Sequence, residues 1–361
     1  MSDTAYRRLR EFLDRFPLGF PATESGVEMK ILKRLFTEEE ARLVCDLTPF
    51  PEEVGRIAQR LGIREETLKK SLESMAKKGL IFRIRREGKT YFNAAPFMIG
   101  LYEYSVKKID REMARLFKEY YETAYLEEMG ASDVPGFKVI PVEERIKPGT
   151  VLFPFQKIKE SITGARKIAV AECVCRKEAR LLGEGCDHPL ETCLSFGVAA
   201  EYYIENGMGR EITSQEAIEI IEEADRAGLV HAGVNAKHLS NICNCCPCCC
   251  ASMKGITKRG HQKHKYLNAI FEAVIDQDAC VCCESCIDRC PVGAVVSGDV
   301  VRVDRDRCLG CGLCAGVCPS GAITLCPRED AEEPFDRASD MGMEILKAKQ
   351  RRKLERSGRV G

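Results

Sequence analysis

The chain has 361 residues, enough for two or three domains with their own hydrophobic cores. Its 55 Lys and Arg residues balance its 55 Asp and Glu residues, so overall charge gives no argument for a nucleic-acid or membrane partner. It has no run of about 18 apolar residues and no apolar stretch after Arg7 and Arg8, so we expect neither a membrane span nor a secretion signal. Its 21 cysteines, in a chain that we expect to be cytoplasmic, indicate metal ligation rather than disulfides.

Residues 1–95 predict a winged helix-turn-helix domain. From residue 29 to residue 93 the pattern reads as helices, a tight turn and a hairpin whose two β-rich runs join through Glu87-Gly88. The helix after the turn has apolar residues at helical spacing, and Gly79 is placed to end it. This order of elements is that of a winged helix, a fold that docks DNA by its third helix and its wing.

DNA is a partner that we consider for this domain without favouring it. Basic side chains follow the predicted third helix and wing: Lys77, Lys78, Arg83, Arg85, Arg86 and Lys89. Glu65, Glu66 and Glu73 lie on the same helix and would face phosphates at a cost. The alternative is a winged helix that docks a protein and has a merely solvated basic edge.

Residues 96–130 predict a long helix that links this domain to the next. Its apolar residues recur at gaps of four and three: Tyr102, Val106, Ile109, Met113, Leu116 and Tyr120. Such a seam suits packing against another helix, and in dimeric regulators a helix of this kind joins two winged domains. A homodimer is therefore one interpretation, and packing of the stripe against its own chain is the other.

Residues 137–265 predict a compact, cysteine-rich α/β domain. Its apolar pattern predicts strands over 168–174, 229–231 and 242–245, and a helix over 190–205. Thr213-Ser-Gln-Glu216 is a capping box that opens a second helix, and Gly228 is placed to end that helix.

Seven cysteines of this domain are the candidates for a third metal centre: Cys173, Cys175, Cys186, Cys193, Cys243, Cys245 and Cys246. On a strand, alternate residues share a face, so Cys173 with Cys175 and Cys243 with Cys245 would each present two thiols in one direction. Cys186 and Cys193 lie on a loop and could supply ligands instead.

Cys248, Cys249 and Cys250 follow the seven candidates, so this domain has ten cysteines. A single metal centre needs fewer thiols than this. Adjacent thiols diverge, so this triplet cannot all serve one four-ligand site without an unusual turn, part of which Pro247 could provide. The interpretations left open are a third iron–sulfur cluster with spare cysteines, two centres, a structural zinc, and a thiol or cluster-transfer role.

Two copies of one cysteine string lie near the C-terminus. They are Cys280, Cys283, Cys286 and Cys290 before Pro291, and Cys308, Cys311, Cys314 and Cys318 before Pro319. The spacing C-x2-C-x2-C-x3-C-P binds [4Fe-4S] clusters. Zinc normally takes two C-x2-C pairs separated by a longer loop, so a pair of zinc ribbons is the weaker interpretation.

In the two-cluster arrangement, the last cysteine of each string ligates the other cluster. The predicted ligands are Cys280, Cys283, Cys286 and Cys318 for cluster 1, and Cys308, Cys311, Cys314 and Cys290 for cluster 2. These residues closely resemble bacterial two-cluster ferredoxins. The resemblance implies a pseudo-symmetric 2[4Fe-4S] module of strands and helices over residues 271–327.

The whole chain also resembles a family of iron–sulfur proteins of anaerobic bacteria and archaea. Three segments of the middle domain carry the resemblance: Glu172 to Arg176, Cys186 to Cys193, and Cys243 to Cys250. The resemblance implies a role in anaerobic metabolism. After the module, residues 328–361 read as a polar tail whose basic helix over 341–356 is either solvated or docks an acidic partner.

The predicted elements describe an α+β multidomain protein, and two complete cluster motifs favour electron transfer to or from a partner oxidoreductase. A redox-responsive winged-helix transcription regulator that senses through its clusters is the alternative. A stand-alone enzyme ranks below both, because no nucleotide loop or nucleophile motif names a substrate.

Overall fold

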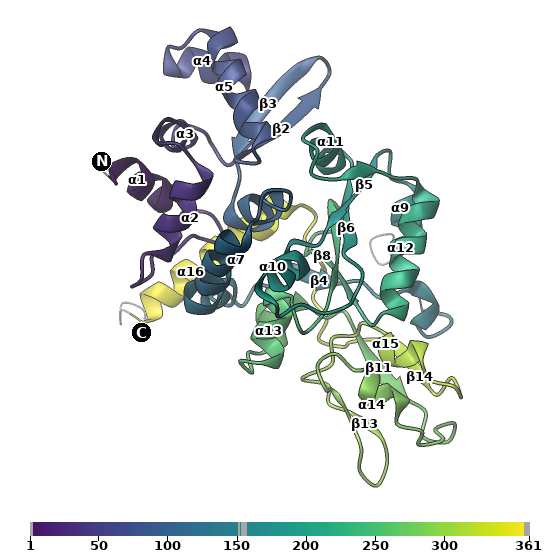
Figure 1. Ribbon diagram of the computed structural model, residues 1–361. Helices are drawn as coiled ribbons and strands as arrows, with labels where there is room; N and C mark the ends of the chain where they lie inside the picture. Colours follow the sequence, from purple (N-terminus) through teal and green to yellow (C-terminus); the bar gives the residue numbers. More distant parts are fainter. Residues whose placement is uncertain (1–2, 151, 153–156, 357–361) are drawn as a thin grey trace.

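The computed structural model describes residues 3–150, 152 and 157–356, and its mixture of helices and sheets confirms the α+β class (Figure 1). The N-terminal part ends in a helix, a turn, a second helix and a hairpin. Its elements are α1 (Thr4–Leu13), α2 (Val27–Leu35), α3 (Glu38–Val44), β1 (Glu52–Glu53), α4 (Val54–Leu61), α5 (Glu65–Lys77), β2 (Ile81–Arg86) and β3 (Lys89–Ala94).

Local sequence signals explain where these elements begin and end. The Thr37 hydroxyl accepts a hydrogen bond from the Glu40 amide at 3.2 Å, and the Glu40 carboxylate accepts one from the Thr37 amide at 2.9 Å, which caps α3. Gly62 ends α4 with φ at 66°. The order of elements agrees with the sequence pattern, and the winged-helix assignment stays a prediction.

The basic hairpin is engaged by the chain itself. Arg83 forms ion pairs with Glu73 of α5 and with Glu205 of the middle domain, and Arg85 contacts the same two carboxylates. The hydroxyl of Tyr202 donates to the backbone of the same region. These contacts hold the N-terminal part against the middle domain and occupy two of the arginines that a DNA-binding surface would present.

The prediction of one continuous helix over 96–130 is wrong. The segment contains an irregular turn over 97–101, then α6 (Tyr102–Tyr104) and α7 (Arg111–Tyr120), which continues through a π-helical segment (Tyr121–Tyr125) into α8 (Leu126–Met129). The break before α7 has a local cause, because the Asp110 carboxylate accepts a hydrogen bond from the Met113 amide at 2.8 Å and starts a new helix.

The apolar seam of this segment packs inside the chain. Five of its six residues are buried: Tyr102, Val106, Ile109, Met113 and Tyr120. Tyr102 and Tyr120 belong to an aromatic cluster around Phe97. The second interpretation of the seam therefore describes the structure, and the homodimer has no support from it.

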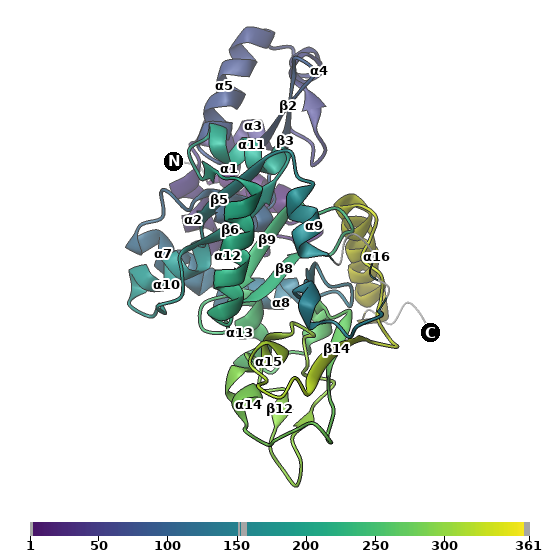
Figure 2. The same cartoon turned by 90° about the vertical axis from the view of Figure 1, so that its right-hand side faces the viewer.

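Seven strands form one sheet in the middle of the chain (Figure 2). In spatial order they are β10 (Leu267–Asn268), β4 (Phe137–Val139), β8 (Val230–Val234), β9 (Asn241–Cys245), β6 (Glu191–Phe196), β5 (Ile168–Glu172) and β7 (Arg210–Glu211). The pair of β10 and β4 is parallel, and the other neighbours pair antiparallel. The helices of this part are α9 (Ile158–Thr163), α10 (Val174–Leu182), α11 (Val198–Glu205), α12 (Ser214–Arg226) and α13 (Ala251–Thr257).

The two faces of this sheet have different chemistry. On one face, Leu194 of β6 and Ile242 of β9 pack with α9 and α12 in an aliphatic core. Because side chains alternate along a strand, Cys193 of β6 and Cys243 and Cys245 of β9 point to the opposite face. That face carries these three thiols.

Two predicted elements differ from the structure here. The strand expected over 168–174 ends at Glu172, and Cys173 and Cys175 belong to the start of α10, where Cys173 is the N-cap. The helix expected over 190–205 is β6 followed by α11, because an apolar run of this length does not distinguish the two. The predicted helix start at Thr213 is confirmed, since its side chain accepts from the Glu216 amide at 3.1 Å.

The C-terminal module consists of two strand pairs and two short helices. Its elements are β11 (Phe271–Ile275), α14 (Ser285–Arg289), β12 (Val295–Val296), β13 (Arg302–Val303), α15 (Leu313–Gly316) and β14 (Ile323–Pro327). β11 pairs with β14, and β12 pairs with β13, so the two halves of the repeat are interleaved.

The tail is not simply solvated. Helix α16 (Ala338–Arg356) packs against Pro17 and the region of α8, where Lys349 pairs with Glu128 of α8 and Arg352 pairs with Asp133 just after it. Ile345 and Ala348 are buried on its inner side. Within the described residues, no helix combines the length and the apolar character that crossing a lipid bilayer requires.

Candidate metal centres

The C-terminal module brings together each predicted set of cluster ligands. Cys280, Cys283, Cys286 and Cys318 line one cavity of about 10 Å³, which we call the cluster 1 cavity and which Cys282 also lines. Cys290, Cys308, Cys311 and Cys314 line a second of about 20 Å³, the cluster 2 cavity. The four predicted thiols at each cavity are the donor set of a [4Fe-4S] cluster, and each set takes its fourth thiol from the other string.

The surroundings of these thiols suit a bound cation. Burial raises the pKa of Cys314 to about 12 and raises that of Cys311 well above its ordinary value, so both need a metal in order to become thiolates. The backbone amide of Ala294 donates to the Cys290 sulfur at 3.1 Å, and that of Gly310 donates to the Cys308 sulfur at 3.4 Å. Hydrogen bonds of this kind tune the reduction potential of a cluster.

One glycine of the second string is required by close packing. Gly310 has φ at 65°, and a Cβ there would lie 2.1 Å from the carbonyl oxygen of Phe271. The loop that carries Cys308 and Cys311 therefore follows β11 closely, which a larger residue would prevent.

The two cavities differ in their exposure. Cys282 and Cys283, beside the cluster 1 cavity, are exposed, and Val281 between Cys280 and Cys282 is 64% exposed. The cluster 2 side faces the middle domain, because Lys263 donates to the carbonyl oxygen of Cys308 at 2.6 Å. The module thus has an outer, solvent-facing end and an inner end.

Six cysteines of the middle domain surround a larger cavity, which we call the chamber. They are Cys173, Cys175, Cys193, Cys243, Cys245 and Cys250. Hydrogen bonds join these thiols into a chain of neighbours, which runs Cys173, Cys175, Cys250, Cys245, Cys243 and Cys193. The chamber has a volume of about 60 Å³, several times that of either cavity in the C-terminal module.

The fold explains why these thiols converge. The strands β6 and β9 supply three of them from one sheet face, as the alternation of side chains requires. The other three stand at the first residues of two helices, because Cys173 is the N-cap of α10 and Cys250 is the N-cap of α13. Hydrogen bonds from Cys193 and Cys245 hold the pKa of Cys243 well below its ordinary value, as expected of a thiolate in a shared site.

Two ionisable side chains border the chamber. Glu103 lines it and accepts a hydrogen bond from the Gly100 amide at 2.8 Å, and burial raises its pKa to about 8. Arg176 is fully buried in the wall, where it donates to the carbonyl oxygen of Asn244 at 2.8 Å and to the hydroxyl of Thr192. A buried guanidinium beside several thiols balances the charge that they carry when ionised.

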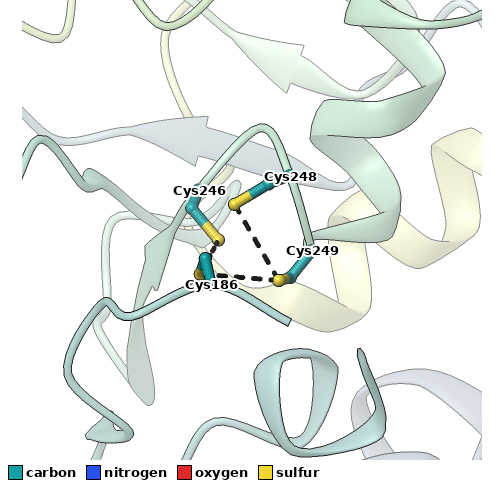
Figure 3. A group of neighbouring side chains, drawn as sticks. All are labelled: Cys186, Cys246, Cys248 and Cys249. Carbon is teal, nitrogen blue, oxygen red and sulfur yellow. Dashed lines mark hydrogen bonds between the residues drawn. The ribbon is translucent and has the colours of Figure 1, made fainter. Parts of the chain in front are cut away.

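Four further cysteines form a separate, tight group, which we call the thiol quartet (Figure 3). They are Cys186, Cys246, Cys248 and Cys249, and their sulfur atoms all lie within 4.8 Å of one another. The sulfur of Cys186 is 3.9 Å from that of Cys246 and 3.6 Å from that of Cys249. The sulfurs of Cys248 and Cys249 are 3.9 Å apart.

The predicted third centre is thus divided between two places. Five of its seven candidates line the chamber: Cys173, Cys175, Cys193, Cys243 and Cys245. Cys186 and Cys246 belong to the thiol quartet, although Cys246 also touches the chamber wall. The candidate set lacked Cys248, Cys249 and Cys250. These three cysteines are consecutive in the sequence, which gave no sign that Cys248 and Cys249 belong to the quartet and Cys250 to the chamber. Glu103 has no sequence signal that separates it from other charged residues, and Arg176 lies in a segment that carries the family resemblance but does not reveal its place in the chamber wall.

The paired strands, the two cysteine-lined cavities and the internal repeat define the C-terminal part as a dicluster iron–sulfur module. Comparison with family models agrees, since residues 273–325 match the family described as a 4Fe-4S dicluster domain. The comparison with curated proteins and that with solved structures gave no match. The family match covers the module alone, so the roles of the middle-domain thiols are argued from their geometry.

Proposed function

We propose that the protein transfers single electrons through two [4Fe-4S] clusters and a third centre, to or from a partner oxidoreductase. The observation that carries this proposal is the pair of cavities, each lined by its four predicted cysteine ligands, in a module that matches a dicluster family. Bound there, [4Fe-4S] clusters supply reversible one-electron reduction at potentials that the protein environment sets. The thiols of the predicted cluster 1 and cluster 2 sets would hold them.

The outer end of the module is the side on which we expect the redox partner. Cys283 and its neighbours reach the surface there, and Val281 offers an exposed apolar contact. Cluster 2 lies toward the middle domain, beside Lys263. An electron accepted at the outer end would therefore pass inward through cluster 2.

The chamber is our candidate for the third centre. Its six thiols exceed the four that a cube needs, and its cavity is larger than those of the module. Its lining is otherwise mainly apolar, with Met98, Phe137, Leu267 and Met253 among the residues. A shielded, thiol-lined chamber of this size favours an iron–sulfur cluster over a single metal ion.

The regulator alternative would require a DNA-binding surface on the N-terminal part. Arg83 and Arg85 are paired with Glu73 and Glu205 instead, so no observation favours that role. We therefore propose protein docking for this part of the chain.

An EPR-monitored redox titration of protein purified without oxygen tests the proposal. Reduction at low potential should give signals from the module clusters together with an additional signal from the chamber. The variant Cys243→Ser should lose the additional signal and keep the other two, because Cys243 lines the chamber alone. Protein without any cluster that can be reduced would overturn the electron-transfer function.

A further inference from the structure

We propose that the thiol quartet binds one zinc ion, in a site separate from the chamber. Its members come from two segments that lie far apart in the sequence. Cys186 follows α10, and Cys246, Cys248 and Cys249 lie on the loop between β9 and α13. Figure 3 shows the four side chains turned toward a common centre.

The sulfur distances fit a single tetrahedral ion. Zinc bonds to thiolate sulfur at about 2.3 Å, and a tetrahedron with bonds of this length separates neighbouring sulfurs by about 3.8 Å. The distances from Cys186 to Cys246 and Cys249, and from Cys249 to Cys248, are 3.9, 3.6 and 3.9 Å. The quartet therefore already has the dimensions of a four-thiolate zinc site.

The same distances argue against a cube in the quartet. A [4Fe-4S] cluster holds its four thiolates on four different irons, so they stand farther apart than the ligands of one ion. In the described part of the chain, the quartet is the one group of metal-ligating side chains found with all ligand atoms within 4.8 Å. The cysteines of the cluster cavities and of the chamber do not form so tight a group.

Hydrogen bonds outside the quartet hold its two loops in position. The Arg180 guanidinium donates to the carbonyl oxygen of Cys186 at 3.0 Å and to that of His188 at 2.7 Å. On the other loop, the Cys250 amide donates to the carbonyl oxygen of Cys246 at 3.1 Å and closes the turn that contains Pro247. These hydrogen bonds fix the two loops so that the four thiols face one another, as the ligands of one tetrahedral ion must.

Charge also suits a four-thiolate zinc site. Four thiolates around one Zn²⁺ carry a net charge of about −2, which needs nearby cations or hydrogen bonds when it is shielded from water. The Arg176 Nη1 lies 3.9 Å from the Cys246 sulfur. The site therefore has a buried cation on its inner side, and Cys248 lies on its more open side.

The position of the quartet indicates a structural role for the bound ion. Its loop is flanked by Cys245 and Cys250, which both line the chamber. An ion bound to the quartet would fix the turn between them and so hold both chamber thiols in place. Zinc suits this task because it has no redox chemistry of its own beside a redox centre.

Elemental analysis of protein purified without oxygen tests the assignment. We expect about one zinc per chain in the natural protein, and Cys248→Ser should lower zinc retention by about tenfold or more. Cys45→Ser is the matched control, since Cys45 donates to the Ala41 carbonyl in the N-terminal part, far from the quartet. The EPR signals of the module clusters report whether each variant is folded.

Cobalt substitution gives a second readout that needs no electron-transfer activity. Co²⁺ in the quartet should give the intense visible bands of a tetrahedral thiolate complex, and Cys248→Ser should remove them while Cys45→Ser keeps them. Natural protein with its clusters but without zinc would overturn the proposal, as would equal zinc in Cys248→Ser or iron in place of zinc. Each of these results leaves the module clusters, and hence the proposed function, unaffected.

Discussion

The Arg176 guanidinium lies between the two thiol groups of the middle domain, 3.9 Å from the Cys246 sulfur of the quartet and in the wall of the chamber. It is fully buried and is fixed by the Asn244 carbonyl oxygen and the Thr192 hydroxyl. Nearby thiolates, including Cys173 and Cys246, raise its pKa despite its burial, so it is permanently charged. One cation therefore serves both groups of thiolates.

Replacing this cation should shift the potential of the chamber centre. Reduction adds a negative charge that a nearby guanidinium stabilises, so Arg176→Gln should make this potential more negative. The expected shift is about 60 mV for each 1.4 kcal/mol of lost stabilisation. The measurement is the redox titration of the additional EPR signal, and Arg176→Lys should restore part of the shift.

Lys177→Gln is the matched control for this charge change. Lys177 follows Arg176 on α10 but pairs with Glu172 at 2.6 Å and does not line the chamber. It should leave the chamber potential nearly unchanged. Equal potentials for Arg176→Gln and natural protein would contradict the role assigned to Arg176.

The crossed ligand sets of the module give a second prediction. Cys318 lines the cavity of the first string, and Cys290 lines that of the second. Cys318→Ser should therefore alter the EPR signal of the solvent-facing cluster 1, and Cys290→Ser that of cluster 2. Cys326→Ser, on β14 outside both cavities, should change neither. If each variant disturbs the cluster of its own string instead, the crossed arrangement is wrong.

Glu178 should make stability depend on pH. The Tyr102 hydroxyl donates to its carboxylate at 2.6 Å, and burial raises the pKa of Glu178 from 4.5 to about 7. The folded state then holds this proton more tightly than the unfolded state, so the free energy of unfolding falls as pH rises from about 4.5 to about 7. The stabilising contribution is fully present below this window and is lost above it.

Thermal unfolding of Glu178→Gln at about pH 5 and about pH 7 measures this contribution. Gln cannot ionise, so the melting temperature of the variant should change less between the two values than that of the natural protein. Lys118, Lys254 and Glu122 also act on this carboxyl, and they remain in both proteins. Identical pH dependence would show that Glu178 does not titrate in this window.

Tyr202 should couple the N-terminal part to the middle domain. Its buried hydroxyl lies 3.0 Å from the Ala76 carbonyl oxygen and 2.6 Å from that of Ile81. Tyr202→Phe leaves both acceptors without this donor and should destabilise the protein by about 1–2 kcal/mol. Chemical denaturation measures the loss, with the partly exposed Tyr91→Phe as the control. Equal stability of the two variants would contradict the coupling.

Local signals in the sequence predicted part of this structure well. The cysteine spacing identified the dicluster module because one short loop carries three ligands of each cluster. The cap at Thr213 and the Glu87-Gly88 hairpin also depend on neighbouring residues, and both appear where they were expected. Glu87 and Gly88 have φ at 52° and 74°, the conformation that a tight hairpin turn requires.

The predictions failed where contacts between residues far apart in the sequence decide the structure. Periodicity over 96–130 could not reveal that Asp110 starts a new helix or that the seam packs on its own chain. The apolar run before Gly197 is compatible with a strand as well as with a helix. It forms the strand β6 because it pairs with β5 and β9. The division of the middle-domain cysteines depends on two loops meeting, which spacing cannot show.

Iron and acid-labile sulfide per chain, measured on protein purified without oxygen, test most directly whether the chain holds a third iron–sulfur centre beside its dicluster module. The account predicts about twelve or more of each in the natural protein, and a fall to about eight in the Cys243→Ser, Cys250→Ser double variant. About eight of each in both proteins would contradict it, because the chamber would then hold no cluster.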